Sequence, residues 1–119
     1  MAYKIRFYKT IRGKAPILDY IRMLENQSGK SSRIKLAKIQ EYINVLRTYG
    51  KQVGEPYIKH LVGDIWELRP TDDRILFAGW DGNSFVLLHH FLKKSQKTPQ
   101  KEIEQAKRNF EDYKKRYKD

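Results

Sequence analysis

Cysteine is missing from the sequence, which excludes disulfide bonds, thiolate catalysis and cysteine-based metal sites. Long apolar runs are missing too, because none approaches the roughly 20 residues that a membrane-spanning helix needs. The first residues lack the apolar stretch and the small-residue cleavage site of a secretory signal. Glycine-rich phosphate loops and the H-E-x-x-H metal motif are also absent. We therefore expect a cytoplasmic protein with no membrane segment and no cofactor.

Histidine is scarce as well. The chain has three, His60, His89 and His90. Adjacent residues of a regular strand point to opposite faces of a sheet, so His89 and His90 cannot both serve one site. A histidine metal site would need two distant segments to meet. We expect no metal.

Acidic residues are few relative to basic ones. The 119 residues include 25 Lys and Arg against 14 Asp and Glu, a formal net charge of +11. Charge of this size raises the local concentration of polyanions and speeds their encounter. It favours nucleic acid, the ribosome or an acidic protein as the partner, with a soluble protein that happens to be basic as the alternative. An anionic membrane is disfavoured, because no basic segment is paired with a strong apolar insertion face.

The length suits a single domain over residues 1–119, and 39% hydrophobic residues are enough for one modest core. Residues 3–9 alternate imperfectly between apolar and basic types, which predicts a strand at or near a sheet edge. Apolar residues at helical spacing predict a helix after Pro16 and a second one over 33–49, ended by Gly50. The polar break at 28–32 makes this pair a helical hairpin.

Three segments of strand composition follow, over residues 57–70, 74–80 and 84–92. The turn sequences RPTDDR and WDGNS separate them, and the second contains the Asp-Gly pair of a β-hairpin. The pattern predicts a three-stranded antiparallel meander.

A terminal helix closes the chain, with Thr98 as the predicted N-cap and Pro99 at the first helical position. We interpret Tyr113 and Tyr117 on this helix as packing residues. The predicted fold class is α+β, with an N-terminal strand, a helical hairpin, an antiparallel β-meander and a C-terminal helix.

Basic residues gather at the predicted strand ends. Arg69 ends one strand, Arg74 opens the next, and Lys93 follows the last one. Successive antiparallel strands reverse direction, so these three residues should meet at one end of the sheet. Because both arginines lie at strand ends, we expect them outside the core.

Such a site suits RNA strand cleavage, in which the 2′-hydroxyl attacks the neighbouring phosphate and the 5′-oxygen leaves. Arginine and lysine can hold the phosphate and stabilise its developing charge, and a histidine or a lysine can move the protons. Simpler interpretations stay open. The arginines can pair with Glu67, Asp72 or Asp73 at a solvated turn, the lysines can form an ordinary solvated loop, and His89 can be a hydrogen-bonded core residue.

The sequences KHLVGDIWELRP, RILFAGW and VLLHHFLKKSQKTPQKEIEQA resemble the HigB toxins of the phage Gp49-like branch of the RelE/ParE superfamily. The likeness is close over residues 59–106. It implies a RelE/ParE-like toxin of a type II toxin–antitoxin pair, which enters the ribosomal A site and cuts the translated mRNA without metal. Its neutralising partner would be a separate helix-turn-helix antitoxin, HigA-like, in a toxin–antitoxin hetero-oligomer.

The resemblance also implies roles for individual residues. Arg69 and Arg74 would hold phosphate, and Lys59, Lys93 and Lys94 would contact the RNA backbone, with one of these lysines or His89 in proton transfer. The full candidate set is therefore catalytic Arg69, Arg74, His89, Lys93 and Lys94, with RNA-binding Lys59, His60 and Lys97.

Two other functions fit the same sequence. A ParE-like toxin would inhibit gyrase and cleave nothing, although it would have little use for cations clustered around a phosphate-sized site. A non-catalytic basic module would only bind nucleic acid or a protein partner.

Overall fold

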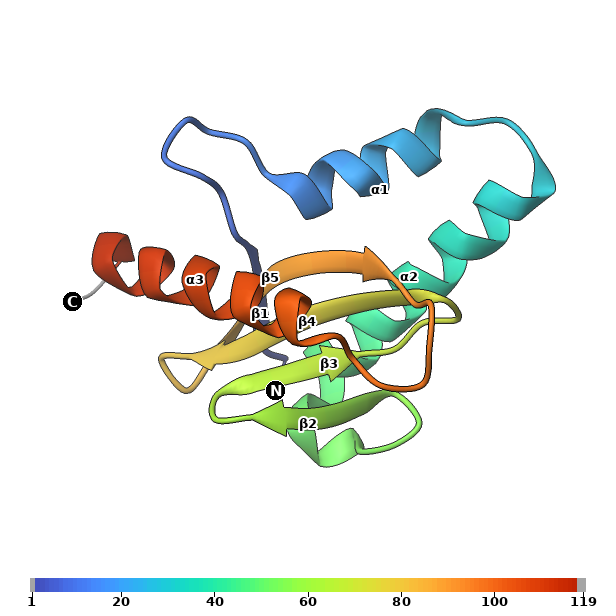
Figure 1. The fold of residues 1–119 in the computed structure, drawn as a ribbon. Coiled ribbons are helices and arrows are strands. Elements are labelled where there is room, and N and C mark those ends of the chain that lie inside the picture. The colour runs from blue at the N-terminus through green and yellow to red at the C-terminus, as the bar shows by residue number, and fades with distance from the viewer. Residues whose placement is uncertain (1, 118–119) are drawn as a thin grey trace.

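The computed structural model describes residues 2–117. The elements along the chain are β1 (Lys4–Phe7), α1 (Pro16–Asn26), α2 (Lys30–Tyr49), a 3₁₀ turn η1 (Gly50–Val53), β2 (Ile58–Val62), β3 (Ile65–Leu68), β4 (Asp73–Trp80), β5 (Ser84–Leu92) and α3 (Gln100–Tyr117). The strands form one sheet in the order β1-β5-β4-β3-β2 (Figure 1). Only the β1–β5 pair is parallel among these strands, so the sheet is mixed. The predicted α+β class is confirmed.

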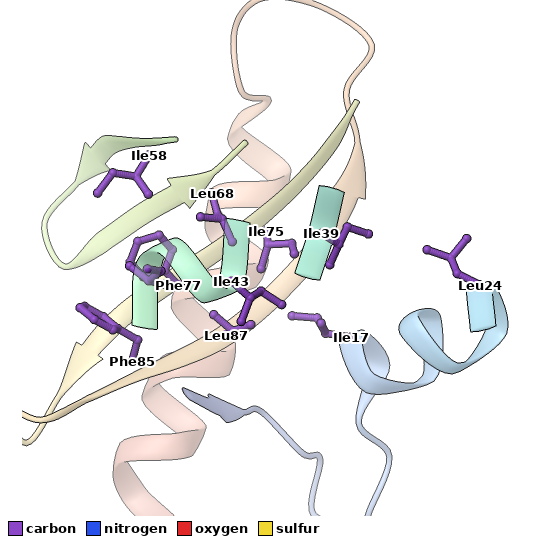
Figure 2. Close-up of a cluster of buried hydrophobic side chains, with 11 residues drawn as sticks. Ile17, Leu24, Ile39, Ile43, Ile58, Leu68, Ile75, Phe77, Phe85 and Leu87 are labelled. Carbon is purple, nitrogen blue, oxygen red and sulfur yellow. The ribbon is translucent and has the colours of Figure 1, made fainter. Parts of the chain in front are cut away.

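Helices cover both faces of the sheet. The α1–α2 pair lies on one face and α3 on the other (Figure 1). Figure 2 shows the core beneath the pair, where Ile39 and Ile43 of α2 meet Leu68, Ile75 and Leu87 of the sheet. Because successive strand residues face opposite sides, the alternate residues of the same strands form a second core under α3.

The helical hairpin follows the predicted pattern with one shift. α1 begins at Pro16, as predicted, and α2 ends before Gly50. Gly50 has a φ of 66°, which glycine adopts without the strain that a side chain would cause. A β-carbon at Gly50 would lie 2.7 Å from the Tyr3 ring, so this position also lacks room for a side chain. α2 begins at Lys30 rather than at 33, because its first turn is polar and carries no apolar periodicity that could reveal it.

The meander has four strands rather than the predicted three. Residues 57–70 form two strands, β2 and β3, that pair with each other in antiparallel fashion. Gly63 adopts a φ of 53° between them, and this left-handed conformation allows a tight turn at the Gly63-Asp64 pair. β1 is an edge strand, as predicted, although it is shorter than residues 3–9.

The terminal helix packs through one face. Tyr113 is buried and lies 5.1 Å from the Trp80 ring, which confirms its packing role, whereas Tyr117 is exposed and stacks on Tyr113 at 4.6 Å. α3 begins at Gln100, so Thr98 lies too early to be its N-cap. Within residues 2–117, none of the helices has the length and apolar character to cross a bilayer.

Candidate functional site at the basic end of the sheet

The strand register brings three cationic residues to one end of the sheet. Leu68 pairs with Ile75, so Arg69 and Arg74 lie on either side of the β3–β4 turn. The backbone N–H of Lys93 donates a 2.8 Å hydrogen bond to the carbonyl of Asp72 in the same turn. We call Arg69, Arg74 and Lys93 the basic end. The predicted meeting of these strand ends is therefore present in the fold.

A buried carboxylate lies between the two arginines. Glu67 is 2% exposed, and its Oε1 lies 3.5 Å from Nε of Arg69 and 3.9 Å from Nε of Arg74. Its Oε2 accepts a 2.6 Å hydrogen bond from the hydroxyl of Thr98. Glu67 pairs in register with Leu76, which belongs to the core under α3, so this group lies on the α3 face. The pairing with Glu67 that the sequence left open is therefore real, but a single carboxylate serves both guanidinium groups.

Arg74 is buried, which corrects the expectation that both arginines lie outside the core. It is 6% exposed, and its Nη1 donates hydrogen bonds of 2.7 Å to the carbonyl of Thr71 and 2.9 Å to that of Asp73. Burial lowers the pKa of Arg74 and the charge of Arg69 lowers it further, while Glu67 raises it. A guanidinium stays protonated under such shifts. Arg74 therefore holds the turn and contributes a buried positive charge.

Arg69 is more accessible than Arg74. Its side chain is 21% exposed, against 8% for Arg74. Its Nε is buried and has no hydrogen-bond partner among residues 2–117, with the Glu67 carboxylate as the nearest opposite charge. Apart from that edge, the guanidinium makes no side-chain hydrogen bond in the described part of the chain, so its remaining donors are available for an anion.

Lysines surround the basic end. Lys59 pairs in register with Glu67 and so shares its face of the sheet. Lys93, Lys94 and Lys97 lie in the loop that leads from β5 to α3. Within residues 2–117, none of these four lysines lies in an ion pair with a carboxylate. Their charges therefore add to the positive field around Arg69.

The predicted histidines separate. His89 pairs in register with Leu76 on the α3 face, and its Nε2–H donates a 2.7 Å hydrogen bond to Glu102 of α3. His60 pairs with Trp66 on the opposite face from Lys59, and its Nε2–H donates to the carbonyl of Gly63 at 2.7 Å. The fold thus brings His89 to the α3 face but does not bring His60 to the basic end.

Asp73, which the sequence offered as a partner of the arginines at a solvated turn, is instead a second buried carboxylate with other side-chain partners. Its Oδ1 accepts hydrogen bonds from the hydroxyl of Tyr20 at 2.7 Å and from Nε2–H of His90 at 2.8 Å, while Lys35 Nζ lies 3.8 Å from Oδ2. Burial alone would raise the pKa of Asp73, but the hydrogen bonds from His90 and Tyr20 and the charge of Lys35 hold it below its ordinary value. This carboxylate ties α1, α2 and β5 to the start of β4.

His89 and His90 point to opposite faces of the sheet, as expected for adjacent residues of a strand. His89 contacts Glu102 of α3, and His90 contacts Asp73. Across residues 2–117, no three histidine and carboxylate side chains gather closely enough to hold a metal ion. The basic end has a different chemistry: an accessible guanidinium and nearby lysines can bind a phosphodiester and stabilise negative charge that develops on its oxygens.

The chain matches a known protein family. The family model described as "Phage derived protein Gp49-like (DUF891)" matches residues 17–111, which cover both helices of the hairpin, the meander and most of α3. No curated protein matches the chain.

Proposed function

Because the chain belongs to the phage-derived Gp49-like family, a toxin-like family related to RelE and ParE, we propose that it is a HigB-type toxin that cleaves ribosome-bound mRNA. The observation that supports cleavage is the position of Arg69 at one end of the sheet, where it is partly exposed. Lys59 lies opposite the neighbouring Glu67, and the backbone of Lys93 bonds to the same turn. Cations grouped at one end of the sheet suit phosphoryl chemistry better than they suit inhibition of gyrase.

In the proposed reaction the 2′-oxygen of one nucleotide forms a bond to the adjacent phosphorus, and the bond from phosphorus to the 5′-oxygen breaks. The products are a 2′,3′-cyclic phosphate and a 5′-hydroxyl. Negative charge grows on the non-bridging oxygens in the transition state. The outer donors of Arg69 bind these oxygens, and because they are held in place beforehand they stabilise the transition state more than the ground state.

The other basic residues have supporting roles in this proposal. Lys59, Lys93, Lys94 and Lys97 hold the RNA backbone through its phosphates. Arg74 fixes the turn that carries Arg69 and adds its buried charge. The 2′-hydroxyl loses a proton and the leaving 5′-oxygen gains one, and His89, with Nε2 held by Glu102, would carry this proton at Nδ1. A nearby lysine is the alternative for that step.

The proposed partners follow from the same reasoning. The net charge of +11 favours approach to mRNA and to the ribosome, both of which are polyanions. The toxin-like family implies an antitoxin partner, and we propose that it is a HigA-like helix-turn-helix protein that forms a hetero-oligomer with this chain.

Primer extension on mRNA from cells that express the protein tests the proposal. We expect cuts inside translated codons for the wild type and for Arg33→Ala, an exposed arginine on α2 that serves as the matched control. We expect the cuts to disappear in Arg69→Ala. Growth arrest with intact mRNA and damaged DNA would overturn the proposal in favour of gyrase inhibition, and unchanged cuts in Arg69→Ala would overturn the role given to this residue.

A further inference from the structure

Glu67 is an acidic residue at the centre of a cationic site. It is 2% exposed, and the other three residues of β3 are the apolar Ile65, Trp66 and Leu68. A buried carboxylate is costly unless charged or hydrogen-bonding partners surround it. Its partners are Arg69, Arg74 and Thr98.

The first consequence concerns the two arginines. The guanidinium groups of Arg69 and Arg74 lie close enough for the charge of one to lower the pKa of the other, and Glu67 acts in the opposite direction. The negative charge of Glu67 between them offsets the repulsion of the two guanidinium groups, so both can remain at the basic end. Glu67 also lies against the Nε edge of Arg69, so the opposite edge of that guanidinium is directed away from the protein interior.

The second consequence concerns the loop that carries three lysines, Lys93, Lys94 and Lys97. One end of the loop is fixed where the N–H of Lys93 meets the carbonyl of Asp72. The other end is fixed where Thr98 donates its hydroxyl to Glu67, 31 residues away in the chain. A residue that only capped α3 would instead accept a hydrogen bond from a helix N–H. The same carboxylate therefore contacts both Arg69 and the lysine loop.

We propose that Glu67 and Thr98 are positioning residues of the RNA-cleaving site: Glu67 sets the orientation of the Arg69 guanidinium, and Thr98 fixes the loop of Lys93, Lys94 and Lys97 beside it. This inference rests on the proposed function. Neither residue touches the reacting atoms. Glu67 acts on the chemical step through Arg69, and Thr98 acts on RNA binding through the lysines.

Three threonine variants test the tether in steady-state cleavage of ribosome-bound mRNA. Thr98→Val keeps the shape of the side chain and loses the hydroxyl, and we expect KM to rise about tenfold with kcat nearly unchanged, the scale of one hydrogen bond to a charged group. Thr98→Ser restores the hydroxyl and should recover the wild-type KM. Thr48→Val, at an exposed position on α2, is the matched control and should behave as the wild type.

Glu67→Gln tests the other half of the inference. We expect kcat to fall about a hundredfold, the scale seen when one transition-state donor is misplaced. A signature independent of cleavage is the Nε–H resonance of Arg69 in ¹⁵N NMR spectra. Because this Nε is buried beside Glu67, we expect its proton to exchange with water slowly in the wild type and fast in Glu67→Gln. Amide hydrogen exchange over residues 93–98 should likewise accelerate in Thr98→Val and not in Thr98→Ser.

The outcomes separate the two proposals. If the wild type cleaves mRNA and Thr98→Val shows the same kinetics and the same amide hydrogen exchange as the wild type, the inference is overturned and the proposed function still stands. Equal losses in Thr98→Val and Thr98→Ser also overturn it, because the hydroxyl would then have no role. Wild type that cleaves no message overturns the proposed function itself. If Glu67→Gln does not fold, the threonine series alone decides the inference.

Discussion

The hydroxyl of Tyr20 donates a 2.7 Å hydrogen bond to the buried carboxylate of Asp73, 53 residues further along the chain. This contact joins α1 to the first residue of β4, next to Arg74. The ring of Tyr20 also stacks on His90 at 4.0 Å. The helical hairpin is therefore anchored to the sheet by a polar contact close to the basic end, in addition to its apolar core.

Removal of the Tyr20 hydroxyl should destabilise the fold. Tyr20→Phe keeps the ring and its stacking but leaves Asp73 without one of its two hydrogen-bond donors. We expect the free energy of unfolding to fall by about 1.5–3 kcal/mol, the range for hydrogen bonds to charged groups. Urea unfolding measures the change. Tyr49→Phe, at an exposed tyrosine of α2, is the control and should unfold at the wild-type midpoint.

Stability should fall in acid through Asp73. Hydrogen bonds from His90 and Tyr20 and the charge of Lys35 outweigh burial and keep the folded-state pKa of Asp73 below its ordinary value. A lowered pKa means that the ionised carboxylate stabilises the fold above the unfolded pKa of about 3.9, and that this stabilisation is lost as the pH falls through the folded pKa.

Asp73→Asn measures this contribution. The variant should be less stable than the wild type at neutral pH, and the difference in unfolding free energy should narrow as the pH falls below about 4. Asp19→Asn removes an exposed carboxylate of α1 and is the control. A difference between the wild type and Asp73→Asn that stays constant across the acid range would contradict the ion-pair account.

Replacement of Arg74 by alanine should destabilise the fold more than replacement of Arg69. Arg74→Ala leaves the carbonyls of Thr71 and Asp73 without their buried donor and removes one of the two cations beside the buried Glu67, so we expect the free energy of unfolding to fall by about 3–5 kcal/mol. Arg69→Ala should cost much less, because Glu67 keeps Arg74 and Thr98. Chemical denaturation of both variants checks this. An Arg74→Ala variant as stable as the wild type would contradict the structural role of Arg74.

The loop lysines should act through salt-dependent binding. Replacement of Lys94 and Lys97 by Ala should weaken binding of a short single-stranded RNA, and should reduce the slope of log K against log salt by about 0.7 for each phosphate that is no longer neutralised. Fluorescence anisotropy at several salt concentrations measures the slope. Lys38→Ala, whose lysine is paired with Glu41 on α2, should leave the slope unchanged. An equal reduction in the control would indicate a non-specific effect of net charge.

Much of the fold could be predicted from local patterns. Pro16 and Gly50 mark helix ends because their backbone preferences act within one turn of the chain. The β2–β3 hairpin was missed because its local signal is the Gly63-Asp64 pair, which marks a hairpin less strongly than Asp-Gly or Asn-Gly does. The start of α2 was missed because its first turn is polar.

The site was predictable only in part. The meeting of Arg69, Arg74 and Lys93 follows from counting strand directions, which needs no side-chain detail. The buried positions of Glu67 and Asp73 do not follow, because their partners lie on other elements, 31 residues away for Thr98 and 53 for Tyr20. The one available signal was an acidic residue in the inward-facing register of an apolar strand, at Glu67.

Attack by the 2′-hydroxyl is the central claim of the proposed function, and a single substitution in the RNA tests it. Purified protein is added to ribosomes programmed with a labelled message, either all-ribose or with one 2′-deoxynucleotide at the mapped cleavage position. We expect the all-ribose message to be cut into a 2′,3′-cyclic phosphate and a 5′-hydroxyl fragment, and the deoxy-substituted message to stay intact at that position. Equal cleavage of both messages, or of neither, would contradict the account.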